Sequence, residues 1–228
     1  MSRPDPAAGV LETVCVEGGR ALLLGEHLAR LRASVRALFG AVVGEELDAL
    51  VAEALDGFEA DCRLRVIWAP GRGVRARLAP LGVGAEPVLL RPWALPGGLG
   101  AHKWADRRPL DAATERLGAT PLVLDADGAV LEAAWGNVWA LEGRRLVTPP
   151  ADGRLLPGVT RARLLLIAPQ LGFEAAEEAL DVARLSAADA IVVTSAVRMA
   201  VAARLGAEPV DPHPAVAIAG ALHDDAAR

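Results

Sequence analysis

Only one of the 24 lysine and arginine residues of the chain is a lysine, Lys103. An arginine side chain stays protonated, whereas a lysine amine can lose its proton and attack an aldehyde to form an imine. Arginine can serve solubility, ion pairs and phosphate contacts equally well. The retention of a single amine therefore favours imine chemistry at Lys103, with a chance survivor of arginine-biased coding as the alternative.

Two polar residues follow an apolar run in the segment VLEAAWGNVWAL. Glu132 stands at the end of that run, and a carboxylate there could keep the ring nitrogen of a pyridine cofactor protonated, so that the ring accepts electrons. A glutamate at a strand end is often only solvated, which is the alternative. Asn137 is the only asparagine of the chain, and we include it among the candidate cofactor-binding residues.

Three further segments offer groups that bind anions. LLPGVTRARLLL places Val159 and Thr160 in the first turn of a predicted helix, where N–H groups, a hydroxyl and the positive helix end favour an anion. An ordinary cap by Thr160 is the alternative. In IVVTSAVR, Ser195 follows a buried strand, and in EHLARL, Arg30 lies beside an apolar helix face, where it either extends to solvent or pairs with a buried anion.

The elements that position these residues alternate between strands and helices. In the first half we expect strands over residues 10–16 and 20–24, helices from Glu26 to Gly40 and over 45–55, and a hairpin over 63–78. The hairpin carries four arginines on one face, which we interpret as solvated, with an anion-binding surface as the alternative: Arg63, Arg65, Arg75 and Arg77.

The second half begins with a segment rich in proline and glycine, RPWALPGGLG, which predicts a linker over residues 91–100. Helices are expected over 109–117 and 160–171 and near 185, and strands over 121–124 and 190–193. Hairpins in both halves exclude a doubly wound Rossmann sheet and predict a mixed α+β fold. We expect a smaller N-terminal domain over 1–90 and a larger domain over 101–228 that carries Lys103.

The composition limits the function classes. A net charge of −5 and a pI near 5.4 argue against a nucleic-acid partner. There is no apolar run long enough to span a membrane and no signal-like N-terminus. Cys15 and Cys62 predict buried thiols in a reducing cytoplasm. The four histidines lack ligand-like spacing, so we expect no metal site.

The order of these motifs is more specific than any one of them. EHLARL, a lone lysine, LEAAWGNVW, TPP, LPGVTR and VTSAVR succeed one another as in the fold-type IV pyridoxal-phosphate enzymes, the class IV aminotransferases, which the chain resembles from about Gly9 to beyond Met199. The resemblance implies a two-domain fold like that of D-amino-acid aminotransferase, pyridoxal 5'-phosphate as cofactor and a homodimer. It assigns the imine to Lys103, the pyridine nitrogen to Glu132, and the phosphate to Arg30, Val159, Thr160, Ser195 and Ala196.

Two arginines bear on the reaction. Arg107, four residues after the lysine in HKWADRR, and Arg198 in TSAVRMAV resemble the lyase branch, and either could bind a substrate carboxylate. The implied reaction converts 4-amino-4-deoxychorismate to p-aminobenzoate and pyruvate, through a Lys103 aldimine, in folate-type metabolism. Glu12 in GVLETV instead resembles many aminotransferases, so transamination of a branched-chain or D-amino acid is the alternative. A non-catalytic relative that binds the cofactor poorly is a second alternative.

The chain also departs from the family pattern. It begins only nine residues before Val10, where the family carries a further hairpin, so we expect that hairpin to be shortened. The chain has no tyrosine, and the phenol that often contacts the cofactor's 3′ oxygen must be replaced or absent. These departures leave the substrate open more than the fold.

Overall fold

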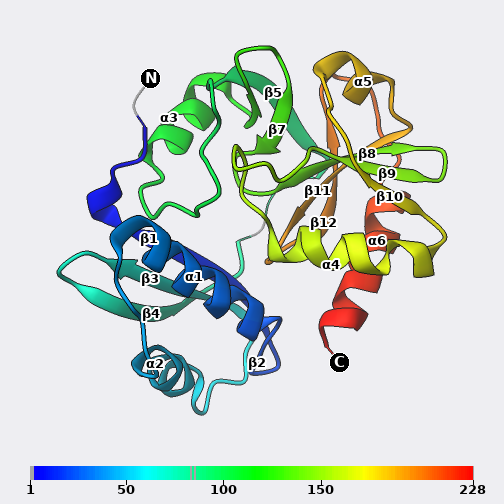
Figure 1. Cartoon of the computed structure of the whole chain (residues 1–228). Coiled ribbons are helices and arrows are strands. Elements are labelled where there is room, and N and C mark those ends of the chain that lie inside the picture. The colour runs from blue at the N-terminus through cyan, green and yellow to red at the C-terminus, as the bar shows by residue number, and fades with distance from the viewer. Residues whose placement is uncertain (1–2, 83, 85, 228) are drawn as a thin grey trace. The chain divides into compact units, whose positions relative to one another are not determined.

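The computed structural model describes residues 3–82, 84 and 86–227. These residues form two compact units (Figure 1). The N-terminal unit contains residues 3–82 and the short segment 102–107, and the C-terminal unit contains the other described residues. The segment that bears Lys103 thus groups with the N-terminal residues, whereas the sequence places it in the larger domain. The division into domains over 1–90 and 101–228 remains a prediction.

The N-terminal unit is a four-stranded antiparallel sheet in the order β2-β1-β3-β4 with two helices. Along β3, Leu64 and Val66 are fully buried and pack with Leu31 of α1 and Leu47 of α2 in one core. The alternating positions carry the four arginines, and Arg65 lies opposite Arg77 in the strand register. The elements are β1 Val10–Glu17, β2 Arg20–Ala21, α1 Leu24–Phe39, α2 Glu46–Leu55, β3 Cys62–Ala69 and β4 Gly73–Ala79.

The strand predicted over 20–24 is shorter than expected. Only Arg20–Ala21 pairs with β1, and α1 begins at Leu24, two residues before the predicted start. Leu23 precedes the helix in a left-handed conformation with φ 52°, and this residue redirects the chain from strand to helix. Gly40, with φ 62°, ends α1 as predicted.

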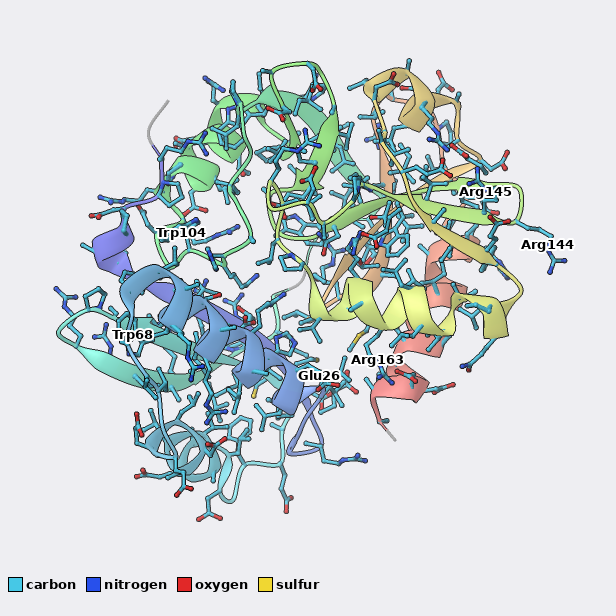
Figure 2. The ribbon with its side chains drawn as sticks, viewed as in Figure 1. Glu26, Trp68, Trp104, Arg144, Arg145 and Arg163 are labelled. Atoms are coloured by element: carbon cyan, nitrogen blue, oxygen red, sulfur yellow. The ribbon has the colours of Figure 1, made fainter. Side chains whose placement is uncertain are left out.

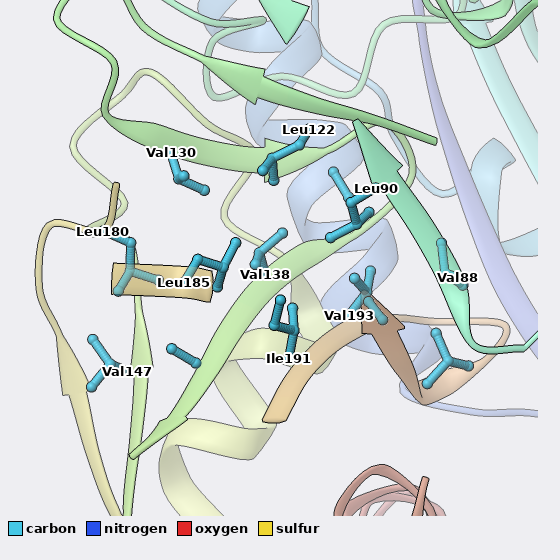
Figure 3. Packing of buried hydrophobic residues seen from close by; sticks show 14 residues of the cluster. Val88, Leu90, Leu122, Val130, Val138, Val147, Leu180, Leu185, Ile191 and Val193 are labelled. Carbon is cyan, nitrogen blue, oxygen red and sulfur yellow. The ribbon is translucent and has the colours of Figure 1, made fainter. Parts of the chain in front are cut away.

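The C-terminal unit contains an eight-stranded mixed sheet in the order β10-β9-β8-β11-β12-β5-β6-β7. Its main apolar core, shown close up in Figure 3, includes Leu90, Leu122, Val138 and Val193, all fully buried. The elements are β5 Val88–Ala94, α3 Arg108–Leu117, β6 Thr120–Leu124, β7 Val130–Ala133, β8 Asn137–Glu142, β9 Arg145–Thr148, α4 Val159–Ile167, β10 Glu174–Glu177, α5 Val182–Ala187, β11 Ala190–Ser195, β12 Met199–Arg204 and α6 His213–Ala226.

The linker predicted over 91–100 is wrong in its first part. Residues 91–94 belong to β5, which pairs in parallel with both β6 and β12. Leu90 and Trp93 of this strand are buried, and Arg91 and Pro92 between them are exposed. The sequence did not reveal this strand because Arg91 and Pro92 interrupt its apolar residues.

The glycine-rich remainder of that segment is anchored to the C-terminal unit. Gly97 donates its N–H to Asp125 over 2.7 Å, and Gly100 donates to the carbonyl of Arg154 over 3.2 Å. A Cβ on Gly98 would meet the Arg154 carbonyl oxygen at 2.0 Å, so the close approach requires glycine there. The chain therefore runs along a fixed course just before the Lys103 segment.

The helix predicted over 160–171 is divided in two. The α-helix α4 ends at Ile167, and a 3₁₀ turn, Ala168–Leu171, continues to Gly172 because Pro169 cannot continue the α-helical hydrogen bonds. α4 and α6 lie side by side in Figure 1, and Arg163 of α4, labelled in Figure 2, donates to Asp225 of α6 over 2.7 Å. None of the helices in the described part of the chain is long and apolar enough to cross a membrane.

Candidate active site

The predicted site residues divide between the two units. Lys103, Arg30 and Arg107 belong to the N-terminal unit. The others belong to the C-terminal unit: Glu132, Asn137, Val159, Thr160, Ser195, Ala196 and Arg198. In the described ranges, no group of three or more His, Cys, Asp or Glu residues is arranged to hold a metal ion.

Lys103 lies in a segment that runs along the free edge of β1. Leu11 donates its N–H to the Lys103 carbonyl over 2.8 Å, Ala105 donates to Gly9 over 3.0 Å, and Trp104 forms a bridge with Val10. The Trp104 side chain, labelled in Figure 2, packs against the apolar core of the N-terminal unit. These backbone bonds on β1 hold the Lys103 backbone in a fixed place.

The preceding residue fastens the same segment to α1. His102 Nδ1 lies 3.0 Å from the Ser34 hydroxyl of α1, and burial lowers the pKa of His102. The lysine segment is thus attached to both the sheet and the first helix. This arrangement suits a residue that must present its amine in one direction.

A buried carboxylate lies beside the Lys103 segment, at Glu12 of β1. Arg30 of α1 donates to Glu12 Oε1 through Nε and to Oε2 through a terminal nitrogen, each over 2.7 Å. His27 Nδ1 lies 2.8 Å from Glu12 Oε2. Glu12 is 1% exposed and His27 is 2% exposed. Arg30, the predicted phosphate ligand, is therefore oriented by a buried acid.

The charges in this cluster explain its protonation states. Burial by itself raises the pKa of Glu12, but the hydrogen bonds from His27 and Arg30 outweigh it and bring the pKa to about 2. Burial lowers the pKa of His27; the bond to Glu12 opposes this effect, while the charges of Arg30 and Lys103 reinforce it. His27 is therefore neutral near pH 7 and donates to an ionised Glu12. The charges of Lys103 and Arg30 thus act on the same group, the His27 imidazole.

In the C-terminal unit, Glu132 lies in β7 and Asn137 begins β8, and each is 5% exposed. Leu156 donates its N–H to Glu132 Oε2 over 3.3 Å, and its carbonyl accepts from Asn137 Nδ2 over 2.9 Å. In the register of β8 and β11, Asn137 is the partner of Thr194, the residue before Ser195. The fold therefore brings Glu132 and Asn137 together at the loop that precedes α4.

The predicted anion site is the first turn of α4, where Val159 and Thr160 are both buried. Gly158 precedes the helix, and within the described residues no side chain caps it. Arg161 fixes this end of the helix, because it donates to the carbonyl of Pro149 over 2.8 Å and pairs with Glu177. The helix start thus presents N–H groups from a fixed position.

The turn after β11 carries the remaining candidates. The Ser195 hydroxyl accepts from the N–H of Arg198 over 3.3 Å, so the turn closes on itself, and Ala196 lies within it. The Arg198 guanidinium lies 5.3 Å from the centre of the Trp135 ring and donates to Glu86 over 2.8 Å. The guanidinium predicted to bind a substrate carboxylate is therefore stacked on an indole and paired with a carboxylate of the chain itself.

Sequence reasoning missed several partners of these residues. His27 was examined only for metal-ligand spacing, although EHLARL places it one helical turn before Arg30. Leu156 contributes only backbone groups, so no side-chain signal could reveal it. Trp135 and Glu86 gain their roles from tertiary contacts with Arg198.

Comparison with known proteins shows what the chain is similar to. Residues 98–205 match the model of the amino-transferase class IV family. A hypothetical aminotransferase from Mycobacterium tuberculosis, solved with α-ketoglutarate and PMP bound, superposes with a TM-score of 0.87 at 24% identity, over 99% of this chain and 92% of that one. A provisionally named 4-amino-4-deoxychorismate lyase from Legionella pneumophila superposes with a TM-score of 0.80 at 21% identity, over 96% and 91%.

Among curated proteins, the branched-chain-amino-acid aminotransferase of Escherichia coli K12 is 33% identical over 73 residues. That match covers 32% of this chain and 24% of the relative, so the chain matches about a quarter of the relative's length. The fold is that of the fold-type IV pyridoxal-phosphate enzymes. Residues 98–205, just under half of the chain, match the class IV aminotransferase family model within this fold. The prediction of an α+β fold of this type is confirmed, and the family match supports the predictions of a class IV enzyme and of pyridoxal phosphate as cofactor.

The residues present fit this cofactor. Its phosphate needs N–H donors, which the uncapped start of α4 offers, and a Cβ on Gly158 would be 2.0 Å from Asn137 Oδ1, so no larger residue fills that place. Its ring nitrogen needs a carboxylate shielded from water, which Glu132 offers. Its aldehyde needs an amine, and Lys103 is the only lysine of the chain.

Proposed function

We propose that the protein is a pyridoxal-phosphate-dependent lyase that converts 4-amino-4-deoxychorismate to p-aminobenzoate and pyruvate. The observation that carries the proposal is the presence of two arginines that resemble those of the lyase branch. Arg107 follows Lys103 by four residues, and Arg198 is held on the Trp135 ring. The proposed substrate has two carboxylates, and a guanidinium binds a carboxylate through two parallel hydrogen bonds. The likeness in fold to the Legionella pneumophila protein supports the same reaction class.

Each residue has a role in this proposal that follows from its surroundings. Pyridoxal phosphate, when bound, supplies an aldehyde and a ring that accepts electrons. The Lys103 amine would hold that aldehyde and would act as the base for the proton on the carbon beside the substrate nitrogen. Glu132 holds a proton at the ring nitrogen.

The phosphate and the substrate are held by other groups. The N–H groups of Val159, Thr160 and Ala196, the Ser195 hydroxyl and Arg30 bind the phosphate. Glu12 and His27 orient Arg30 for this contact, since Glu12 holds its guanidinium in one plane. Arg107 and Arg198 bind the substrate carboxylates. The departure of pyruvate then leaves an aromatic ring, which provides the driving force.

Transamination of a branched-chain or D-amino acid is the second candidate function. The observation that favours it is the match to the Escherichia coli branched-chain-amino-acid aminotransferase. The same residues serve both reactions up to the removal of the proton by Lys103. The two would differ in their products, which are a keto acid in transamination and p-aminobenzoate with pyruvate in the lyase reaction.

Product analysis separates the two candidates. Purified, cofactor-loaded protein is incubated with 4-amino-4-deoxychorismate, and p-aminobenzoate and pyruvate are measured. Equimolar release of both products, absent in Lys103→Ala, is the expected result. Absence of release from a protein whose absorbance shows bound cofactor would overturn the lyase proposal and favour transamination, which is then assayed with amino-acid and keto-acid pairs.

We also propose that the protein is a cytoplasmic homodimer and acts in folate-type metabolism. The proposal rests on family resemblance. Light scattering coupled to size-exclusion chromatography should give a mass of twice 23.7 kDa. A monomer mass for the active, cofactor-loaded protein would contradict the dimer.

A further inference from the structure

The loop before α4 is held at one peptide from two sides. The N–H of Leu156 donates to Glu132 and its carbonyl accepts from Asn137, over 3.3 Å and 2.9 Å. Glu132 lies in β7 and Asn137 in β8, which follow one another in the chain and are joined by a turn in which Ala133 and Gly136 form an isolated bridge. The loop therefore has a fixed distance from the carboxylate that is proposed to meet the cofactor ring.

The other end of the Asn137 amide faces Gly158. A Cβ on Gly158 would lie 2.0 Å from Asn137 Oδ1 and 3.3 Å from the Arg161 Cβ. The backbone of Gly158 has φ −66° and ψ 137°, a conformation that any residue adopts. Space, rather than backbone conformation, therefore requires glycine, and Asn137 is what fills that space.

This packing has a consequence for the start of α4. The residue that precedes a helix commonly caps it with a Ser, Thr, Asp or Asn side chain that accepts from the first N–H groups. Asn137 occupies the place where such a side chain would begin, so position 158 is left without one. The N–H groups of Val159 and Thr160 are thereby kept for an external anion.

We propose that Asn137 is a positioning residue for phosphate binding. Its Nδ2 holds Leu156, its Oδ1 excludes a side chain at Gly158, and together these contacts set the start of α4 at a fixed distance from Glu132. A cofactor whose phosphate and ring nitrogen are a fixed distance apart requires such spacing. The proposal rests on the phosphate role given above to Val159 and Thr160, and it changes the role of Asn137 from a cofactor ligand to a residue that acts through the loop and helix.

The residue type fits this task. Leu156 presents a carbonyl oxygen, which needs a donor, and an aspartate would face it with a carboxylate instead. An aspartate would also place a buried negative charge near a bound phosphate. Asn137→Asp keeps the shape of the side chain, removes the donor and adds this charge, and the Gly158→Ala variants below test the contact without a change of charge.

The test compares pyridoxal phosphate with pyridoxal, which has the same ring and aldehyde but no phosphate. Dissociation constants for both are measured by quenching of tryptophan fluorescence in the wild type and in Asn137→Asp. We expect the wild type to bind pyridoxal phosphate more tightly than pyridoxal. In the variant, the ratio of the two dissociation constants should be at least about tenfold less favourable to pyridoxal phosphate. The affinity for pyridoxal itself should change by less than about threefold.

Thr148→Val is the matched control. The Thr148 hydroxyl is fully buried and donates to the carbonyl of Val138, the neighbour of Asn137, over 2.9 Å. Valine has nearly the same shape, so this variant also loses one buried hydrogen bond beside β8. It should lower the thermal stability and leave the preference for the phosphate unchanged. An equal loss of preference in Thr148→Val would show a general structural effect and would overturn the proposal.

A second pair of variants keeps the proposal testable if Asn137→Asp does not fold. Gly158→Ala should lose the preference for the phosphate, because its methyl group displaces Asn137 or the helix start. In Asn137→Ala/Gly158→Ala the methyl group has room, so the loss should be smaller than the sum of the two single losses. Additive losses would contradict a direct contact between the two positions.

These results are independent of the reaction. A wild type that binds pyridoxal as tightly as pyridoxal phosphate, or an Asn137→Asp variant that loses both affinities equally, would overturn the positioning role. Loss of the phosphate preference in Asn137→Asp, in a protein that releases no p-aminobenzoate, would support the positioning role while the lyase proposal fails.

Discussion

Arg30 donates one hydrogen bond to each carboxylate oxygen of Glu12, both of 2.7 Å. The pair lies at the junction of β1 and α1, and His27 provides a further partner for Glu12. A paired geometry of this kind fixes the plane of a guanidinium that would otherwise turn about several bonds. Phosphate binding by Arg30 would then need little further ordering of the side chain.

Loss of the Glu12 charge should be costly. Glu12→Gln leaves Arg30 with an incompletely paired charge in a buried place, and breaking a buried ion pair from one side costs about 3–5 kcal/mol. Asp48→Asn is the control, because the pair of Arg32 and Asp48 is a third to a half exposed and should contribute at most about 1 kcal/mol. Urea unfolding measures both, and similar losses in the two variants would contradict a structural role for Glu12.

Stability should fall as the pH decreases from about 6.5 toward 2. The pKa of Glu12 is about 2 in the folded chain against 4.5 for the free group, so its contribution is present above pH 4.5 and is lost as the pH falls through 2. The shift corresponds to about 3 kcal/mol. The folded pKa of His27 is also lowered, from 6.5, so the unfolded chain takes up that proton first and folding weakens below pH 6.5.

Two variants separate these contributions. Glu12→Gln should reduce the dependence between pH 4.5 and 2, and His27→Asn should reduce the part that begins near pH 6.5. His213→Gln, at an exposed position, should leave the profile unchanged. Denaturant unfolding from pH 2 to 8 provides the measurement, and a profile that is the same in His27→Asn as in the wild type would exclude His27 as its source.

Lys103 should be required for turnover and dispensable for folding. The backbone of this residue, through its carbonyl, accepts the bond from Leu11, and that bond survives a change of side chain. Lys103→Ala and Lys103→Arg should both lower kcat by at least about 10³-fold, because neither offers a neutral amine. Lys103→Arg keeps the positive charge beside His27 and so controls for electrostatics. Substantial activity in Lys103→Arg would refute the imine role.

Local patterns in the sequence predicted the N-terminal unit closely. The alternation of arginines with Leu64 and Val66 gave the β3–β4 hairpin, because each strand has one buried and one solvated face. The strand β5 was missed because it is broken by an arginine and a proline, and its pairing with β6 and β12 is non-local. α6 was not predicted, since its many alanines give a weak apolar pattern.

The candidate site was predictable only in the residues that perform chemistry. Lys103 and Glu132 stood out by their residue type and their place in the chain. Their supports did not, because the backbone of Leu156 has no sequence signature and the pairing of Glu86 with Arg198 joins residues 112 positions apart. The positions of supports are set by tertiary packing, whereas the chemical groups are set by residue type.

Glu86 should compete with the substrate for Arg198. Its carboxylate pairs with the guanidinium over 2.8 Å and is about half exposed, so a substrate carboxylate can replace it at small cost. Glu86→Gln should lower KM for a carboxylate substrate by up to about fivefold with kcat unchanged, and Arg198→Lys should raise KM.

Glu115→Gln, at an exposed position of α3, is the control for a change of one negative charge. If KM is the same in Glu86→Gln and Arg198→Lys as in the wild type, Arg198 does not bind the substrate carboxylate. A lower KM in Glu86→Gln but not in Glu115→Gln would show that the effect acts through Arg198 rather than through the net charge of the protein.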